Sequence, residues 1–327
     1  MAETLQTEKD LPVHPIQCFA NLDYIAVVGA STRTWISPLD DPGAIRNGFL
    51  SSQGNQYMFI NQGLLQLKLF PRTTSDYKVQ RILVVFQHGY TSKDIQRINE
   101  YTMRLDARVV YVKTVNELVN FLNQRIEKNR AIRKLIFFSH GVIGKISLRY
   151  EGDDVASGEF TKASIAQVNK SVFDYDAEVI SYACRTGIGI DGESFDNSAE
   201  AQPEKSLAQD MANQWMIIVR AFESRSLYAK TYGIGSEIQE AKKAEGAIDD
   251  YEKKEKLYKA GKLKEKPKKP PNYDQLKEKI KSIKVRDHNS KEDGGPIMPL
   301  GAWHLPTSGA TPTGLKHGLQ IYRFKAK

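Results

Sequence analysis

Short apolar segments alternate with amphipathic segments through the middle of this chain. The apolar segments are rich in β-branched and aromatic residues and are bounded by glycine or polar residues, which predicts buried strands. The segments between them repeat apolar residues at helical spacing, and Thr114 and Ser206 each begin a capping-box pattern. This alternation predicts an α/β fold with a mostly parallel sheet flanked by helices. The expected strands cover 82–86, 109–112, 135–138, 179–183 and 216–219, and we expect a last, antiparallel edge strand at 318–324.

Three regions surround this core. The apolar segments 56–60 and 64–70 flank Asn61-Gln62-Gly63, which predicts a β-hairpin. We therefore expect a small β-rich N-terminal region that shields one edge of the main sheet. The predicted organisation is this region at 1–78, the α/β core at 79–235, a protruding charged helical insertion at 236–295, and a C-terminal segment at 296–327 that returns a strand to the core.

The excess of positive charge is local. The whole chain has a net charge of +8, and residues 242–291 alone hold 17 Lys and Arg against 9 Asp and Glu, which is also +8. The rest of the chain is therefore neutral. Interspersed acidic residues and few aromatic rings argue against nucleic acid as a partner and favour a solvated helical insertion; an acidic partner for 242–291 is the alternative.

Two of the expected strands end at residues that can do chemistry. The strand at 135–138 is followed by Ser139, His140 and Gly141, and the strand at 179–183 is followed by Cys184. In an open parallel sheet, ligands bind beyond the carboxyl ends of the strands, near a switch in strand order. A lone cysteine is usually a small buried apolar residue. A cysteine and a histidine placed together at such an edge suit nucleophilic catalysis.

These motifs resemble the caspase-like cysteine peptidases, the group that also holds metacaspases, legumains and gingipains. FFSHGVIGKI and SYACRTG match that group's His-Gly after one strand and Ala-Cys after the next. His140 precedes Cys184 by 44 residues, and caspases have about 50. Tyr182 replaces the caspase glutamine and Thr186 moves the glycine along by one, so aspartate specificity does not carry over. The resemblance covers roughly residues 80–225.

The resemblance implies a cysteine endopeptidase that hydrolyses protein or peptide substrates through a thioacyl-enzyme, without a cofactor or a metal. Cys184 would be the nucleophile, and His140 would take the thiol proton and later protonate the leaving amine. The backbone N–H groups of Gly141 and Cys184 would stabilise the oxyanion. By the same resemblance, the acidic loop at 188–205 and the Lys-rich insertion are candidate sites of maturation cleavage.

Specificity is open at this point. The resemblance places substrate-pocket residues after the first strand, beside the catalytic cysteine and after the fifth strand, and the candidates are His88, Tyr182, Glu223 and Arg225. Glu223 would favour a basic side chain at the cleaved position and Arg225 an acidic one.

Two other classes of protein compete with a peptidase. VVFQHGYTS resembles the His-Gly oxyanion turn of lipases, but a nucleophile elbow needs Gly-x-Ser-x-Gly and Gly141 occupies the nucleophile's place, which leaves a degenerate α/β-hydrolase. The non-enzymatic alternative is a catalytically inactive caspase-like scaffold that binds partners. Such scaffolds usually lack the cysteine or the histidine, and this chain has both.

The composition of the chain bears on its cellular compartment. The sequence has no apolar run of the roughly 18 residues that a membrane span needs. Its polar N-terminus does not resemble a secretory signal, and two cysteines fit a reducing compartment. We therefore expect a cytoplasmic protein without membrane contact; export without a cleaved signal is the alternative. The sequence has no zinc-ligand spacing, P-loop or dinucleotide fingerprint.

Overall fold

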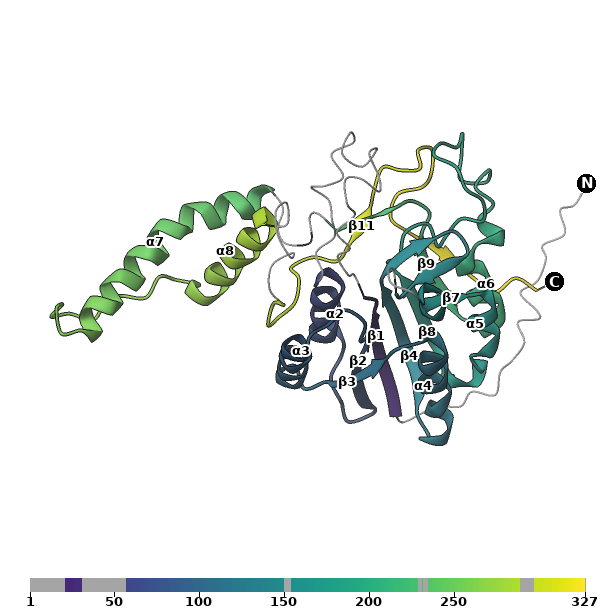
Figure 1. Ribbon diagram of the computed structural model, residues 1–327, viewed down its shortest axis with the longest axis horizontal. Coiled ribbons are helices and arrows are strands. Elements are labelled where there is room, and N and C mark those ends of the chain that lie inside the picture. Colours follow the sequence, from purple (N-terminus) through teal and green to yellow (C-terminus); the bar gives the residue numbers. More distant parts are fainter. Residues whose placement is uncertain are drawn as a thin grey trace, which may run out of the picture.

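The computed structural model describes residues 21–30, 57–149, 154–228, 231, 235–288 and 297–326. Within these residues, seven strands form one central sheet. All neighbouring strands are parallel except the pair at one edge, which the C-terminal strand completes in antiparallel orientation. A mostly parallel sheet with an antiparallel edge strand is the arrangement that the sequence predicts. Helices cover both faces of the sheet (Figure 1). From edge to edge the strands are β12 (Leu319–Tyr322), β9 (Ile218–Phe222), β8 (Phe173–Ser181), β4 (Ala131–Phe138), β1 (Asn21–Val28), β2 (Lys78–Phe86) and β3 (Arg108–Val112).

The strand order reverses once. From β1 the chain continues to β2 and β3 on one side, whereas β4 returns to the other side of β1 and is followed outward by β8 and β9. The switch in strand order therefore lies between β1 and β4. Parallel strands share an edge at their carboxyl ends, and the crevice beyond that edge at a switch point is where such sheets bind ligands.

Alternate residues of each strand build two separate cores, one on each face. Ile82 and Leu135 contribute to the first, and Leu83 and Ile136 to the second, and all four are essentially inaccessible to solvent. Burial on both faces explains why these strands read as continuous apolar runs. The first core lies under α4 (Val115–Glu127), α5 (Lys162–Gln167) and α6 (Leu207–Trp215), and the second under α2 (Met58–Leu69) and α3 (Ser92–Arg104).

The predicted N-caps are confirmed. The Thr114 hydroxyl accepts a hydrogen bond from the Glu117 N–H at the start of α4, at 3.2 Å. The Ser206 hydroxyl accepts one from the Gln209 N–H at the start of α6, at 3.1 Å. Each cap satisfies an N–H group that the first helical turn leaves without a partner.

The predicted hairpin at 56–70 is wrong, because this segment forms helix α2. The Asn61 carboxamide oxygen accepts a hydrogen bond from the Met298 N–H at 2.8 Å, and the Gln62 amide donates to the His304 carbonyl at 3.2 Å. Gly63 allows the helix to lie directly on the sheet, since an added Cβ would come within 2.5 Å of Leu83. Partners more than 200 residues away therefore form hydrogen bonds with the polar side chains that locally predict a turn.

The N-terminal part of the chain also supplies a strand that the sequence pattern did not reveal. β1 pairs with β2 on one side and with β4 on the other, so it lies inside the main sheet and not along an edge. The rest of the predicted N-terminal region, at 1–20 and 31–56, lies outside the described residues.

The charged segment near the C-terminal end is helical, as predicted. Helices α7 (Gly235–Lys259) and α8 (Tyr273–His288) pack against each other and project from the α/β body (Figure 1). A ring contact at 5.2 Å between Tyr251 and Tyr273 joins them. Near the body, His304 Nε2 and the Glu237 carboxylate lie within hydrogen-bonding distance, at 2.7 Å.

The remaining strands belong to two small sheets. β5 (His140–Val142), β6 (Lys145–Ser147) and β7 (Glu159–Thr161) form one of them, and β10 (Ser226–Leu227) pairs with β11 (Thr307–Ser308) in the other. Of the helices that the structure describes, none combines the length and the apolar character needed to cross a bilayer.

A buried ion pair joins β1 to helix α4. Asp23 and Arg125 are both inaccessible to solvent, and Arg125 Nη1 donates to the Asp23 carboxylate at 3.1 Å. Arg130 also pairs with Asp23. Removing one partner of a buried pair leaves an uncompensated charge in a medium of low dielectric constant.

We therefore predict that Asp23→Ala lowers the free energy of unfolding by about 3–5 kcal/mol. The matched control is Asp176→Ala, which removes a half-exposed carboxylate paired with Arg133 and should cost less than about 1 kcal/mol. Urea denaturation of the three proteins measures both values. Equal losses in the two variants would contradict the assignment of a buried, uncompensated charge.

Candidate active site

The two segments that carry the predicted dyad leave the sheet side by side. β4 and β8 are parallel neighbours, and Phe137 of β4 is paired with Ser181 of β8. His140 follows two residues after the end of β4 and begins β5, whereas Cys184 lies in the turn after β8. Both residues therefore lie beyond the carboxyl ends of adjacent strands, next to the switch in strand order.

Gly141 lies in direct contact with the Cys184 backbone. A Cβ added to Gly141 would come 2.6 Å from the Cys184 carbonyl oxygen, 2.9 Å from its amide nitrogen and 2.8 Å from the Ala183 methyl group. Only glycine allows two backbones to approach this closely. The structure thus brings the His140-Gly141 and Ala183-Cys184 motifs together, and none of the described residues accepts a hydrogen bond from the Cys184 N–H.

A segment after β9 holds the Cys184 sulfur. Cys184 as a residue is partly accessible, and the Ser226 N–H donates to Sγ at 3.2 Å. The Ser226 hydroxyl donates to the Tyr182 carbonyl at 2.5 Å, and the Arg185 N–H donates to the Ser224 carbonyl at 3.0 Å. A backbone N–H that points at sulfur stabilises negative charge there. The segment therefore positions the thiol.

The turn that carries Cys184 is rigidly held. Arg185 adopts a left-handed conformation with φ of 55°. The Thr186 hydroxyl donates to Ser181 Oγ at 2.9 Å, and the Gly187 N–H donates to the Phe222 carbonyl at 2.9 Å. The Tyr322 hydroxyl of edge strand β12 donates to the Gly187 carbonyl at 2.7 Å. The C-terminal strand thus helps to position the turn.

Burial keeps the His140 imidazole neutral. Loss of solvent lowers the pKa of His140 from 6.5 to about 4. Phe59 of α2 packs edge-on against the imidazole with ring centroids 5.0 Å apart, and it also contacts the Tyr228 ring at 5.5 Å. A neutral imidazole has one ring nitrogen that can accept a proton. His140 is therefore in the form that a general base requires at neutral pH.

Tyr228 completes the surroundings of the thiol. Its hydroxyl donates to the Tyr182 carbonyl at 3.4 Å. Burial, and after it the negative charge available at Cys184 and Tyr182, raises the pKa of Tyr228 well above its usual range. Tyr228 therefore keeps its proton beside the sulfur at all physiological pH values.

Two of the predicted pocket residues lie inside the protein. Tyr182 is nearly inaccessible and stacks on Phe138 with centroids 4.9 Å apart. Glu223 is also buried, and its carboxylate accepts hydrogen bonds from the Ser198 hydroxyl at 2.5 Å and the Lys316 N–H at 3.1 Å. Tyr182 therefore packs in the core, and Glu223 anchors the acidic loop at 188–205.

The other two predicted pocket residues lie at the surface on different parts of the sheet. Arg225 is half exposed, follows β9 and pairs with Glu193 of the acidic loop at 2.8 Å. His88 follows β2, which is separated from β8 by β1 and β4. At the usual strand spacing this separation is roughly 14 Å. Arg225 is thus close in the chain to the segment that holds the thiol, whereas His88 belongs to a more distant strand.

Sequence reasoning missed Ser226, Tyr228 and Phe59. Ser226 and Tyr228 lie just after the residues to which the family resemblance points, but their spacing carries no signal of its own. Phe59 was missed because its segment was predicted to be a hairpin, and a strand there would have placed its ring elsewhere.

Comparisons with known proteins identify no relative. A scan against protein-family models finds no match, and a search of curated proteins finds none. Within the part of the chain that the structure describes, no group of three or more His, Cys, Asp or Glu side chains is arranged to hold a metal ion.

The contact at Gly141 predicts a strong effect of a single methyl group. Gly141→Ala should lower the free energy of unfolding by about 1–3 kcal/mol, because the new Cβ meets backbone atoms that cannot move easily. Gly246→Ala is the control, because a Cβ at Gly246 in helix α7 meets nothing within 4 Å. That control should stabilise the protein by up to about 1 kcal/mol. Urea denaturation measures both, and a neutral Gly141→Ala would contradict the close approach.

The lowered pKa of His140 predicts a pH-dependent stability. As the pH falls from 6.5 toward 4, the unfolded chain binds a proton at this position before the folded protein does, so the folded state loses stability in that window. His140→Asn removes this contribution, and its urea midpoint should therefore fall less than that of the wild type between pH 7 and pH 4.5. Exposed His317→Asn is the control. Identical pH profiles for wild type and His140→Asn would contradict a buried, neutral imidazole.

Proposed function

We propose that this protein is a cysteine endopeptidase with a caspase-like α/β core, in which Cys184 is the nucleophile and His140 the general base. The observation that carries the proposal is the contact between Gly141 and the Cys184 backbone at the switch in strand order. This contact brings the segment that carries the neutral His140 imidazole next to the partly accessible residue Cys184. It lies at the edge where parallel sheets bind ligands. The resemblance of FFSHGVIGKI and SYACRTG to caspase-like peptidases supports the same assignment.

The chemistry follows from the protonation states. His140 takes the thiol proton as Sγ of Cys184 forms a bond to the substrate carbonyl carbon. The C–N bond then breaks, the leaving amine receives the proton from the imidazolium, and a thioester joins the substrate to Cys184. Water attacks that thioester with His140 again acting as base, which releases the carboxylic acid and restores the thiol.

Two features of the site support charge stabilisation. The Ser226 N–H that points at Sγ stabilises the thiolate before attack. The Cys184 N–H, together with that of Gly141, would stabilise the oxyanion that forms on the substrate carbonyl, and one such donor is worth about 3 kcal/mol. Tyr228 stays protonated, so it places no competing negative charge beside the sulfur.

The placement of the charged candidates favours an acidic over a basic side chain at the cleaved position. Glu223 is buried and bonded to Ser198 and Lys316, so it has no free surface for a substrate. Arg225 is half exposed, and its ion pair with Glu193 is a surface contact, which contributes little to stability and exchanges readily. A substrate carboxylate could replace Glu193 as the partner of Arg225.

Digestion of a peptide library tests activity and specificity together. We expect the wild type to cleave and Cys184→Ala to lose at least about a thousandfold in kcat/KM, since the covalent step is removed. Cys18→Ala is the matched control, because Cys18 is the other cysteine of the sequence, and it should keep full activity. Arg225→Gln should reduce cleavage after acidic residues selectively.

A labelling experiment separates the competing classes. A thiol-reactive probe should label Cys184 in the wild type and in Cys18→Ala but not in Cys184→Ala, and a fluorophosphonate should label no serine. Fluorophosphonate labelling that persists in Cys184→Ala would support a serine hydrolase instead. If no library peptide is cleaved by the wild type, the peptidase proposal fails.

A further inference from the structure

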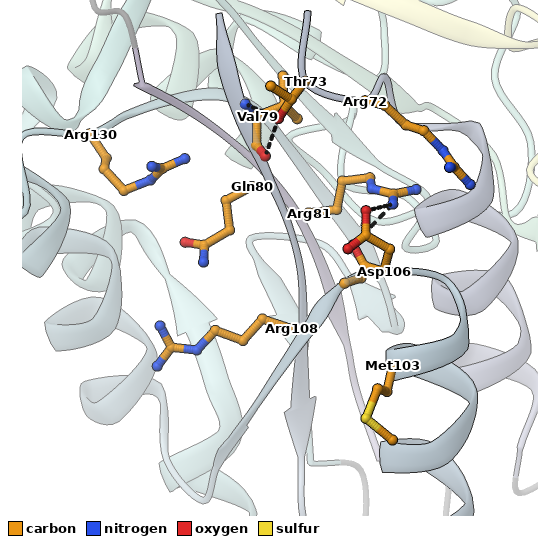
Figure 2. Close-up of a pocket in the computed structure, with 10 residues that line it drawn as sticks. Arg72, Thr73, Val79, Gln80, Arg81, Met103, Asp106, Arg108 and Arg130 are labelled. Carbon is orange, nitrogen blue, oxygen red and sulfur yellow. Dashed lines mark hydrogen bonds and ion pairs between the residues drawn. The ribbon is translucent and has the colours of Figure 1, made fainter.

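The end of the sheet opposite Cys184 holds a basic pocket. The amino ends of β2 and β3 line a cavity of about 640 Å³ (Figure 2), a volume typical of small-molecule sites. The described residues that line it include four arginines, Arg72, Arg81, Arg108 and Arg130, and a single carboxylate, that of Asp106. The lining therefore has a marked excess of positive charge.

The excess is concentrated on one side of β2. Figure 2 shows Gln80 between Arg130 and Arg108 on one side of the strand, and Arg81 with Asp106 on the other. This division follows from strand alternation, since Gln80 and Arg81 are consecutive residues of β2. Arg81 is compensated by an ion pair with Asp106 at 3.0 Å. Arg108 pairs with no acidic residue that the structure describes.

A buried layer beneath Gln80 adds to this positive charge. Asp23 is the neighbour of Gln80 in the register of β1 and β2, and it is the shared partner of Arg125 and Arg130. Two guanidinium groups thus share one carboxylate, and the charge of Arg108 lies close enough to act on Arg125. Burial, and further the nearby charges of Arg108 and Arg130, hold the pKa of Arg125 below its usual value against the opposing effect of Asp23.

Arg125 also has hydrogen-bonding capacity that the protein leaves unused. Its Nε and Nη2 are fully buried and have no hydrogen-bond partner among the described residues. Buried polar groups normally find a partner, and an exception calls for an explanation such as an ion. Arg125 is not among the residues that line the pocket, and its guanidinium group lies over the Phe121 ring at 4.3 Å. It therefore adds positive charge beneath the pocket and does not itself contact a ligand there.

We propose that the Gln80 side of this pocket binds a compact phosphate-bearing anion, held by Arg108 and Arg130. The Arg108 guanidinium group can offer phosphate oxygens two parallel N–H donors, and the Gln80 amide supplies a further donor. Arg130 already donates from Nε to Asp23 and from Nη2 to the Leu22 and Lys78 carbonyls, so it contributes its charge and its Nη1 group. The described lining residues include no aromatic ring on which a nucleobase could stack. The chemistry therefore fits a phosphorylated polyol or a pyrophosphate better than a nucleotide, and it is independent of the peptidase activity.

Isothermal titration of the full-length protein with inorganic pyrophosphate tests the proposal. The wild type should bind saturably at physiological ionic strength, and Arg108→Gln should bind at least about tenfold more weakly because a charge-assisted contact is lost. Arg72→Gln is the matched control: it removes an exposed arginine from the same pocket, away from Gln80, and should change the affinity less than about threefold, the weak effect of an exposed charge.

Gln80→Glu separates loss of binding from loss of folding. The new carboxylate would occupy the place of the anion between two guanidinium groups, so we expect an unchanged or higher thermal midpoint together with loss of pyrophosphate binding. Pyrophosphate should raise the midpoint of the wild type and leave that of Gln80→Glu unchanged. No saturable binding by the wild type, or equal binding by wild type and Arg108→Gln, would overturn the proposal.

A second experiment distinguishes a soluble phosphorylated ligand from a lipid headgroup as the source of the phosphate group. Vesicles containing phosphatidic acid are sedimented with the wild type and with Arg108→Gln. Binding of free pyrophosphate without vesicle binding identifies a soluble phosphorylated ligand. If the wild type binds the vesicles and Arg108→Gln does not, the anion site is supported and a lipid headgroup is identified as the source of the phosphate.

Discussion

The parallel pairing of β4 with β8 is the interaction on which the candidate site depends. It aligns Phe137 with Ser181, so the chain leaves both strands at the same level of the sheet. Only with this register do the His140-Gly141 and Ala183-Cys184 motifs meet. A slip of one residue in either strand would turn its side chains to the opposite face. Gly141 then allows the two backbones to come into contact, at a distance that any side chain would prevent.

Around this contact, the protein uses burial and backbone donors instead of a charged third residue. Burial lowers the pKa of His140 to about 4 and leaves a neutral base at physiological pH. The Ser226 N–H donates to the Cys184 sulfur, and Tyr228 remains protonated beside it. The acidic loop has its own contacts with the body of the protein: Ser198 donates to Glu223, Glu193 pairs with Arg225, and Asp191 pairs with Arg185.

The two ends of the sheet have different electrostatic characters. At the carboxyl ends, the candidate active site is built from neutral groups and backbone N–H donors. At the amino ends, Arg125 and Arg130 both pair with the carboxylate of Asp23, and the charge of Arg108 lies near Arg125. Asp23 joins β1 to α4 through its pair with Arg125, but one carboxylate does not balance three guanidinium groups. The same buried residue thus stabilises the core and leaves a surplus of positive charge at the pocket.

Much of the fold and the identity of the candidate dyad could be predicted from the sequence alone. Runs such as 82–86 and 135–138 are continuous because both faces of the sheet are buried, and Thr114 and Ser206 predict helix starts through local hydrogen bonds. His140 and Cys184 were identifiable because strand ends and glycines are visible in the pattern.

The features that depend on contacts between residues far apart in the chain were decided only by the tertiary structure. In helical segment 58–69, Asn61 and Gln62 form hydrogen bonds with Met298 and His304, and a local pattern carries no information about such contacts. β1 lies inside the sheet because it pairs on both sides. Ser226 reaches the Cys184 sulfur, and Arg108 joins Arg130 across β2, only once the strands are placed. Local propensity determines which elements form, whereas the neighbours of each element are determined by packing and hydrogen bonding across the whole chain.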